Sequence, residues 1–242
     1  MSGRKFALVT GASGGIGSAV ARRLAADGFS LYLHYNQNRQ AIDDVLVELS
    51  QLGCAAVKVQ ADLSLTDGAR RLLAQINDPI DVIVHNSGSS FVGLLTDMSD
   101  EQVRDFVQLH VTSPVLLTKQ LLAGMIHRKS GKIVVVSSVW GRVGASTEVL
   151  YSTVKGALDS FVKSLAKEVA PSGLSVNGIA PGAVDTKMLD HLTEAEKQSL
   201  KDEIPMGRFA APDEIADLAA FLVSEKAAYI NGEIVTIDGA WQ

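Results

Sequence analysis

The stretch that decides the fold reads Phe6-Ala-Leu-Val-Thr10-Gly-Ala-Ser-Gly-Gly-Ile-Gly17. Its first four residues are apolar and predict a short buried strand over 6–9. Glycines at positions 11, 15 and 17 follow, and a helical pattern begins at Ile16. Glycine allows a tight turn and a close approach of the backbone to a ligand, and the free amides of a helix start attract negative charge. We therefore predict a strand, a phosphate-binding turn and a helix, which together hold the pyrophosphate of a dinucleotide.

The rest of the chain alternates the same two patterns. Short apolar runs predict further strands over 30–35, 55–59, 80–84, 132–136, 174–179 and 233–237. Helical spacing of apolar residues predicts helices over 16–27, 40–52, 67–76, 101–128, 149–170 and 212–222. This alternation predicts a single α/β domain over 1–242, with a Rossmann-type, doubly wound parallel sheet of seven strands covered by helices on both faces. The long stretch 182–211, with a helical piece over 193–203, is predicted to be a substrate lid; a fixed structural insertion is the alternative.

Composition excludes several classes of protein. Of the 242 residues, 47% are hydrophobic and 20% are charged, which is typical of a globular chain. The 22 basic and 27 acidic side chains give a net charge of −5 without a basic stripe, so nucleic acid is not an expected partner. The lone Cys54 forms no internal disulfide and supplies no metal cluster, which favours a reducing compartment. No apolar stretch approaches the roughly 18 residues of a membrane span, so we expect a cytoplasmic protein without membrane contact.

A second motif carries the chemistry. Tyr151-Ser-Thr-Val-Lys155 places a phenol and an ammonium four residues apart on a predicted helix, one above the other on the same face. Ser137 and Ser138 follow a predicted strand, at the sheet edge where open α/β sheets bind ligands. Reduction of a ketone by hydride transfer, the reaction implied by the family resemblance given in the next paragraph, requires a proton donor for the oxygen. An unperturbed tyrosine pKa of about 10 is high for this task, and Lys155 together with an oxidised nicotinamide would stabilise the phenolate.

The glycine pattern Gly-x-x-x-Gly-x-Gly and the spacing of Ser138, Tyr151 and Lys155 resemble the classical short-chain dehydrogenase/reductase family. The resemblance covers nearly the whole chain. It implies Tyr151 as general acid, Lys155 as a ligand of the nicotinamide ribose, and Ser138 rather than Ser137 as the hydroxyl that orients and polarises the carbonyl. It is strongest with the 3-oxoacyl-[acyl-carrier-protein] reductase branch, including the ending Asn231-Gly-Glu-Ile-Val-Thr-Ile-Asp-Gly239.

The resemblance also implies a cofactor-binding set. Asp62 and Leu63 correspond to residues that flank the adenine, Asn86 and Gly88 belong to the segment after the fourth strand, and Val184 and Thr186 contact the nicotinamide end. For Asp62 and Asn86, turn or capping roles are the alternative. The full set comprises Gly11, Ser13, Gly15, Ile16, Gly17, Asn36, Arg39, Asp62, Leu63, Asn86, Gly88, Tyr151, Lys155, Pro181, Gly182, Val184 and Thr186.

The end of the second predicted strand indicates the choice of cofactor. An acidic residue there would bond the ribose 2′-hydroxyl of NAD, but His34-Tyr-Asn-Gln-Asn-Arg39 contains none, and the next acid is Asp43. A 2′-phosphate would meet no repulsion, and Asn36, Asn38 or Arg39 could hold it. We therefore predict NADP(H), although Gly14 stands where many NADP-dependent relatives carry a basic residue. The alternative for Arg39 is an exposed side chain at a helix start.

One position departs from the family pattern. The fourth catalytic member of the family is an asparagine that helps to present a backbone carbonyl to a water leading to the lysine, and this chain has His110 there. Pro114 has no amide hydrogen, so the His110 carbonyl loses its helical partner. Our hypothesis is that Pro114 keeps this carbonyl available for water. The alternative is a packed histidine on a kinked helix.

The resemblance implies NADPH-dependent reduction of a 3-oxoacyl thioester to the 3-hydroxyacyl product in fatty acid biosynthesis. Acyl-carrier protein would be the partner, and a homotetramer would form through the predicted helices 101–128 and 149–170 and the carboxyl-terminal strand. Arg128 and Lys129 occupy one carrier-docking position, but the second reads Pro171-Ser-Gly173 without a charge.

Two alternatives stay open. The stretches 139–146 and 203–208 are similar to a Gram-positive paralogue that reduces a 5-aminopentanone group on elongation factor P. A non-catalytic dinucleotide-binding regulator is an alternative of another class, and His110 is its support.

Overall fold

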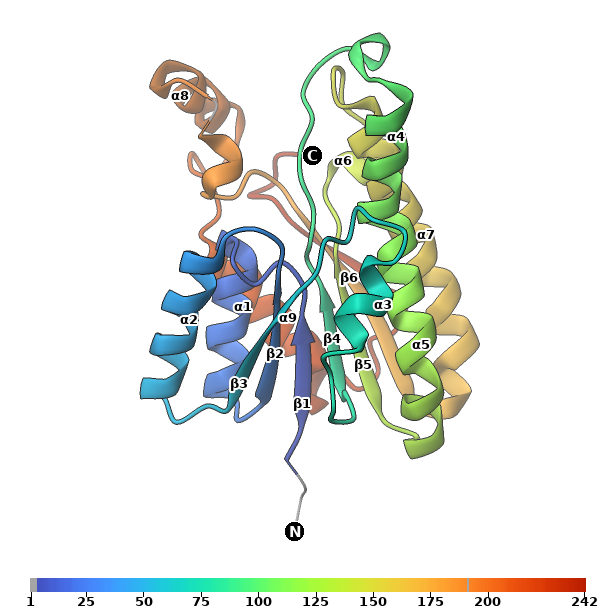
Figure 1. Cartoon of the computed structure of the whole chain (residues 1–242). Helices are drawn as coiled ribbons and strands as arrows, with labels where there is room; N and C mark the ends of the chain where they lie inside the picture. The colour runs from blue at the N-terminus through green and yellow to red at the C-terminus, as the bar shows by residue number, and fades with distance from the viewer. Residues whose placement is uncertain (1–3, 191) are drawn as a thin grey trace.

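A computed structural model describes residues 4–190 and 192–242. Within them, seven parallel strands form one sheet in the order β3-β2-β1-β4-β5-β6-β7 (Figure 1). The strands are β1 (Phe6–Val9), β2 (Ser30–Tyr35), β3 (Ala56–Gln60), β4 (Val82–His85), β5 (Gly131–Val136), β6 (Leu174–Pro181) and β7 (Ile234–Ile237). This confirms the predicted doubly wound parallel sheet.

Helices cover both faces of the sheet. One face carries α1 (Gly15–Ala26), α2 (Arg39–Gln51) and α9 (Pro212–Val223). The other carries α3 (Gly68–Leu73), α5 (Ser113–Arg128) and α7 (Val149–Val169). Three further helices lie toward the carboxyl ends of the strands (Figure 1): α4 (Asp100–Val107), α6 (Trp140–Val143) and α8 (Glu194–Glu203). The result is a sheet between two helical layers, with α4, α6 and α8 beyond its carboxyl edge.

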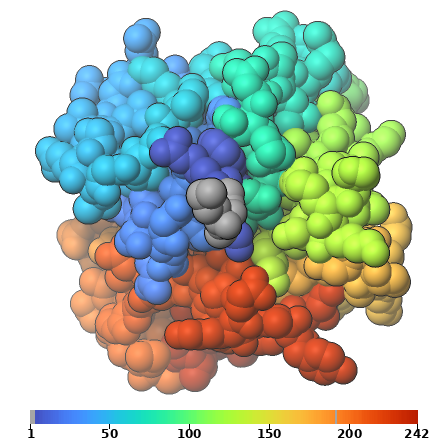
Figure 2. All heavy atoms as spheres, turned by 90° about the horizontal axis from the view of Figure 1, so that it is seen from below, coloured from blue at the N-terminus to red at the C-terminus, as the bar shows by residue number. Residues whose placement is uncertain are grey.

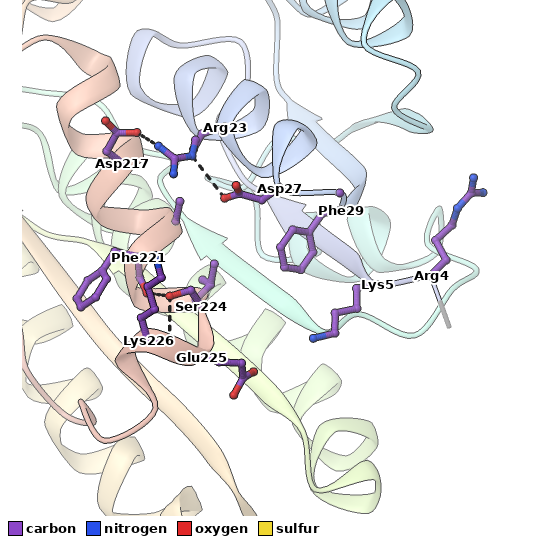
Figure 3. A pocket seen from close by; sticks show the side chains of 13 residues that line it. Arg4, Lys5, Arg23, Asp27, Phe29, Asp217, Phe221, Ser224, Glu225 and Lys226 are labelled. Atoms are coloured by element: carbon purple, nitrogen blue, oxygen red, sulfur yellow. Dashed lines mark hydrogen bonds and ion pairs between the residues drawn. The ribbon is translucent and has the colours of Figure 1, made fainter. Parts of the chain in front are cut away.

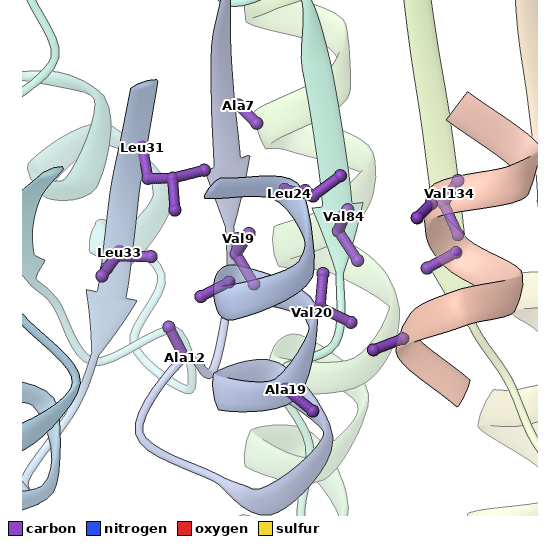
Figure 4. Close-up of a cluster of buried hydrophobic side chains, with 14 of the residues drawn as sticks. Ala7, Val9, Ala12, Ala19, Val20, Leu24, Leu31, Leu33, Val84 and Val134 are labelled. Carbon is purple, nitrogen blue, oxygen red and sulfur yellow. The ribbon is translucent and has the colours of Figure 1, made fainter. Parts of the chain in front are cut away.

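Strand alternation divides the core into two clusters. Ala7 and Val9 of β1 face α1, whereas Leu8 faces the opposite layer. Figure 4 shows the first cluster, in which Val20 and Leu24 of α1 lie against the sheet. Leu8 and Leu24 are fully buried, and burial of such a side chain stabilises the fold by about 1.5–3 kcal/mol.

One predicted helix is interrupted. The stretch predicted as a single helix over 101–128 forms α4, a π-helical turn over Gln108–Thr112, and α5. The Ser113 amide donates to the Gln108 carbonyl, five residues back. Pro114 follows directly and has no amide hydrogen to continue the regular α-helical pattern, which explains why the register changes at this point.

The chain diverges between two neighbouring strands. β1 pairs with β2 on one side and with β4 on the other, so the loops after β1 and β4 leave the sheet in opposite directions. The Thr10 amide donates to the Val84 carbonyl (3.0 Å), and the Asn86 amide donates to Thr10 Oγ1 (2.9 Å). Ligands of open α/β sheets bind at such a switch point.

A hollow of about 880 Å³ lies at the opposite edge of the sheet. It lies between the start of β1 and the end of α9, on the face that Figure 2 shows from below. Arg23 forms ion pairs there with Asp27 and Asp217 (Figure 3). The predicted catalytic residues do not line this hollow, so it is not the candidate active site.

Across residues 4–190 and 192–242, no helix is long and apolar enough to cross a membrane. The same residues contain no group of three or more histidine, cysteine or acidic side chains placed to hold a metal ion.

Candidate active site

The glycine-rich turn needs glycine for steric reasons. Gly11 has a φ of +66°, and a Cβ on Gly17 would lie 2.2 Å from the Gly11 carbonyl oxygen. A Cβ on Gly15 would lie 2.7 Å from Cγ2 of Thr186. The turn is therefore closed against itself and against the segment after β6, and its amides are left at the start of α1.

A cavity of about 650 Å³ opens beside this turn. Besides the turn, it is lined by the ends of β2 and β3, the segment after β4, and α4. Six predicted cofactor residues line it: Gly11, Ser13, Asn36, Asp62, Leu63 and Gly88. Although burial opposes the effect, hydrogen bonds with Ser64 and Asn36 hold the pKa of Asp62 below its usual value. The cavity therefore presents neutral amides and the carboxylates of Asp62 and Asp105 to a ligand.

The three candidates for the 2′-phosphate differ in placement. Asn36 and Asn38 line the cavity, and the Asn38 side chain also accepts a hydrogen bond from the Ala41 amide at the start of α2 (3.1 Å). The Arg39 side chain is 75% exposed and lies 3.7 Å from the Asp43 carboxylate. It is not among the lining residues, so its placement fits the alternative of an exposed residue at a helix start.

Asn86 acts on the turn rather than lining the cavity. Its Nδ2 donates to the carbonyl oxygens of Thr10 (3.1 Å) and Gly11 (3.3 Å). These bonds tie the segment after β4 to the glycine-rich turn. The side chain thus supports the cofactor cavity from beneath.

A second cavity of about 450 Å³ contains the predicted catalytic residues Ser138, Tyr151 and Lys155. Five more of the predicted cofactor residues also line it: Ile16, Pro181, Gly182, and the two predicted at the nicotinamide end, Val184 and Thr186. Ser138 lies just after β5, whereas the other two side chains project from α7. The sheet and one helix therefore bring the predicted proton donor and the predicted nicotinamide segments into one space.

Burial dominates the electrostatics of Tyr151 and Lys155. It lowers the Lys155 pKa to about 8, opposed by the nearby Asp159 carboxylate. It raises the Tyr151 pKa to about 12, opposed by a hydrogen bond with Ser138 and reinforced by Glu148. The lowering of the tyrosine pKa that we expected from Lys155 is not seen in this arrangement. The physical reason is that burial of Tyr151 outweighs the charge, while Lys155 Nζ donates to the Val136 carbonyl (2.9 Å).

His110 lies beside Tyr151 but lines neither cavity. It is 1% exposed, its ring stacks on Phe106 at a centroid distance of 4.3 Å, and it meets the Tyr151 ring edge-on at 6.0 Å. Its Nε2 accepts the Ser89 amide hydrogen (3.2 Å). Burial, together with the Lys155 charge, lowers the His110 pKa to about 3, so the imidazole is neutral. The side chain packs, as the alternative reading held, and the hypothesis on its carbonyl stays a prediction.

Some lining residues were not found from the sequence. Trp140 and Trp241 form a tilted pair, with centroids 4.9 Å apart, in the wall of the catalytic cavity. His34, Gln102 and Phe106 line the cofactor cavity. These contacts join positions far apart in the chain, so a local sequence pattern does not predict them. The exception is His34, which stands two residues before Asn36 and which the sequence pattern predicts only as part of a strand.

The predicted carrier-docking position lies at the other end of the molecule. Arg128 donates to the Ile80 carbonyl (2.7 Å) and lies 3.8 Å from the Asp81 carboxylate. Lys129 ends α5 with a φ of +51°. Both residues precede β5 at the amino edge of the sheet, whereas the catalytic cavity opens at the carboxyl edge of the same chain.

The known proteins to which this chain is similar match it over nearly its whole length. The model of a family described as Enoyl-(Acyl carrier protein) reductase matches residues 11–241. The chain is 58% identical to the uncharacterized oxidoreductase YmfI of Bacillus subtilis, covering 98% of both chains. It is 37% identical to the 3-oxoacyl-[acyl-carrier-protein] reductase FabG of Aquifex aeolicus, covering 97% of this chain and 96% of the relative.

Among solved structures, an actinorhodin polyketide ketoreductase crystallised with NADPH superposes with a TM-score of 0.92 at 30% identity, covering 100% of this chain and 99% of the other. The fold, the glycine-rich turn and these matches agree, and the chain belongs to the classical short-chain dehydrogenase/reductase family of oxidoreductases.

Proposed function

We propose that this protein reduces a protein-tethered ketone with NADPH, with Tyr151 as general acid. The observation that carries the proposal is the meeting of Ser138, Tyr151 and Lys155 in one cavity next to the glycine-rich turn. The turn fits a dinucleotide, because its glycines leave no room for side chains and Gly11, Ser13 and Gly14 of the turn line the neighbouring cavity. The cofactor is NADP(H), which the solved neighbours crystallised with NADPH or NADP support.

Each catalytic side chain has a distinct task. The bound cofactor supplies the hydride that goes to the carbonyl carbon. Ser138 orients the carbonyl oxygen, and Tyr151 gives its proton to that oxygen, so that the ketone becomes an alcohol. Because the Tyr151 pKa is raised, the phenol holds this proton well beyond neutral pH. Lys155 then supplies the positive charge that stabilises the phenolate left behind.

The segment 182–211 is proposed to act as the substrate lid; position 191 of it lies outside the described residues. Leu189, Leu192 and Leu200 line the catalytic cavity from this segment, and Leu200 belongs to α8. They give one wall of the cavity an apolar surface. A lid of this kind would exclude water from the reacting carbonyl.

A 3-oxoacyl thioester on acyl-carrier protein is the first candidate substrate. Its support is the identity over nearly the whole chain to a 3-oxoacyl-[acyl-carrier-protein] reductase. A homotetramer that pairs the helices of 101–128 and 149–170 and the carboxyl-terminal strand belongs to the same proposal.

The 5-aminopentanone group on elongation factor P is the second candidate, and the charge of the cavity favours it. Glu148 and Glu203 line the catalytic cavity, and Lys155 is the one basic side chain among the described residues that do so. Carboxylates attract an ammonium group and repel the phosphate of a carrier-protein arm. The paired Trp140 and Trp241 add aromatic surface that also attracts cations.

One set of assays separates these possibilities. NADPH and NADH oxidation would be followed with acetoacetyl-carrier protein and with aminopentanonylated elongation factor P, for the wild type and for Tyr151→Phe. We expect NADPH-dependent turnover of at least one ketone, lost in Tyr151→Phe by about 10²- to 10⁴-fold. Cofactor binding without turnover of any ketone tested would contradict the proposal and favour a regulator.

A further inference from the structure

His34 stands beneath the cofactor cavity at the carboxyl end of β2. It is 2% exposed, yet it lines that cavity together with Gly11 and Asn36. Its main chain already holds the glycine-rich turn, since the Ala12 amide donates to the His34 carbonyl (2.8 Å). Its side chain makes further contacts that the family resemblance does not assign.

Two of those contacts fix the tautomer of the imidazole. The Gly11 amide, which can only donate, lies 3.1 Å from Nδ1, so Nδ1 carries no hydrogen. The Ala61 carbonyl, which can only accept, lies 3.0 Å from Nε2, so Nε2 carries the hydrogen. The Gly11 contact requires a ring without hydrogen on Nδ1, the Ala61 contact requires hydrogen on Nε2, and together they specify the neutral, Nε2-protonated form. The hydroxyl of Ser87 lies 3.2 Å from Nδ1 and reaches the same acceptor.

These partners belong to three segments of the cofactor cavity. Gly11 opens the phosphate-binding turn, Ala61 precedes Asp62 after β3, and Ser87 follows Asn86 after β4. One rigid ring therefore connects three loops that arise from different strands. A hydrogen-bonded Gly11 amide also fixes the residue whose positive φ shapes the turn.

We propose that His34 is a positioning residue for dinucleotide binding, whose neutral, Nε2-protonated imidazole holds the glycine-rich turn in register with the loops after β3 and β4. Ordering these loops in the free protein lowers the conformational cost of binding. The inference rests on the proposed NADP(H) cofactor and adds a residue outside the catalytic set.

Two conservative variants test the two hydrogen bonds of the His34 ring separately, because each keeps one bond and removes the other. The side-chain oxygen of His34→Asn can replace Nδ1 as acceptor for Gly11, but it does not reach Ala61. The side-chain amide of His34→Gln can replace the Nε2 donor, but it leaves Gly11 without its acceptor. Tyr32→Phe is a matched control on the same strand, because it removes a partly buried hydrogen bond with Asp78 (2.6 Å) at the opposite edge of the sheet.

The measurement is the dissociation constant of NADPH by fluorescence titration, with thermal unfolding of each variant. We expect His34→Gln to bind NADPH about tenfold more weakly, and His34→Asn to stay within about threefold of the wild type. Tyr32→Phe should lower the unfolding temperature without changing NADPH binding. Unchanged binding by His34→Gln, or equal losses in both His34 variants, would overturn the inference.

A second measurement needs no substitution. ¹⁵N NMR of histidine-labelled wild-type protein at neutral pH should show His34 neutral with hydrogen on Nε2. Hydrogen on Nδ1 would overturn the proposal directly. If the wild type bound no NADPH at all, the proposed cofactor would fail, whereas weak binding confined to His34→Gln bears on His34 alone.

Discussion

Lys155 lies one helical turn after Tyr151 on α7, and its ammonium nitrogen stands 5.4 Å from the centroid of the phenol ring. The same nitrogen donates to the Val136 carbonyl at the end of β5. The lysine is thus held between the sheet and the proposed proton donor. Burial lowers the Lys155 pKa to about 8, so this lysine loses its charge just above physiological pH. Tyr151, whose pKa is raised to about 12, keeps its proton at much higher pH.

The pH dependence of reduction follows from this pair. Lys155 is charged below its pKa of about 8 and loses its proton above it. We expect kcat/KM for ketone reduction to fall above about pH 8 with the slope of a single ionisation, which is about tenfold per pH unit. Ionisation of Tyr151 should not contribute in this range, because its pKa is raised to about 12. Lys155→Arg, which stays charged, should be slower but lack this decline. A rate that rises steadily through pH 9 would contradict the assignment.

Adjacent serines offer a matched pair of variants. The hydroxyl of Ser138 bonds to Tyr151, whereas Ser137 Oγ donates to the Lys155 carbonyl (3.3 Å). Ser138→Ala should lower kcat by about 10²- to 10³-fold because the carbonyl loses an oriented donor. Ser137→Ala should cost about 1 kcal/mol of stability with little change in kcat. Steady-state kinetics with urea unfolding would check both, and the reverse order of effects would reassign the catalytic serine.

Cofactor choice should depend on Asn36. Asn36→Asp places a carboxylate in the cofactor cavity, where it would repel a 2′-phosphate and bond the 2′-hydroxyl of NADH. We expect the ratio of kcat/KM for NADPH over NADH to fall by about tenfold or more, which corresponds to about 1.4 kcal/mol. Arg39→Ala is the companion variant, because Arg39 is exposed beside Asp43. A preference unchanged in Asn36→Asp would show that the phosphate is held elsewhere.

The π-helical turn before Pro114 can be tested by restoring an amide. Pro114→Ala supplies the hydrogen that a regular helix would give to the His110 carbonyl. If that carbonyl binds a water that leads to Lys155, the reduction rate should fall and its pH profile should shift. Kinetics across pH, with thermal unfolding to confirm folding, would decide. The idea fails if rate and profile both match those of the wild type.

Three buried histidines predict acid sensitivity. Burial lowers the pKa values of His34 and His85 to about 4 and that of His110 to about 3. The unfolded chain binds protons near its ordinary pKa of about 6.5 while the folded chain does not. Stability from these groups is therefore complete above about pH 6.5 and falls as pH drops toward 4.

The size of that loss can be measured. As the pH falls through this window, each buried histidine should lower the free energy of unfolding by about 1.4 kcal/mol per pH unit. Urea unfolding at a series of pH values would give the unfolding free energy, and His34→Asn should show a smaller slope than the wild type. Equal slopes, or a stability independent of pH between 6.5 and 5, would contradict the burial of neutral imidazoles.

Local patterns predicted the parts of this molecule that local chemistry determines. The need for glycine at Gly17 was visible in the sequence because the turn closes on residues six positions away. The helical spacing of Tyr151 and Lys155 was equally visible. Pro114 indicated a defect in its helix, but the resulting π register depends on how α4 and α5 pack.

Other features depend on pairs that only the folded chain brings together. Trp140 contacts Trp241 at the far end of the chain, and His34 near the end of β2 contacts Ser87 in the segment after β4. The rise in the Tyr151 pKa had the same origin, since the extent of burial is a property of the assembled cavity. A spacing rule predicts which groups are neighbours and not how much water surrounds them.

The two cavities draw on different halves of the chain. Residues 11–109 supply every described group around the cofactor cavity, whereas nearly all of the catalytic wall comes from 136–241. Substitutions within 136–241 can therefore reshape the catalytic cavity without changing any side chain that lines the cofactor cavity. Solved neighbours of the same fold include a polyketide ketoreductase and an L-sorbose reductase, and the carboxyl half, which supplies nearly all of the catalytic wall, is the natural place to engineer new ketone specificities.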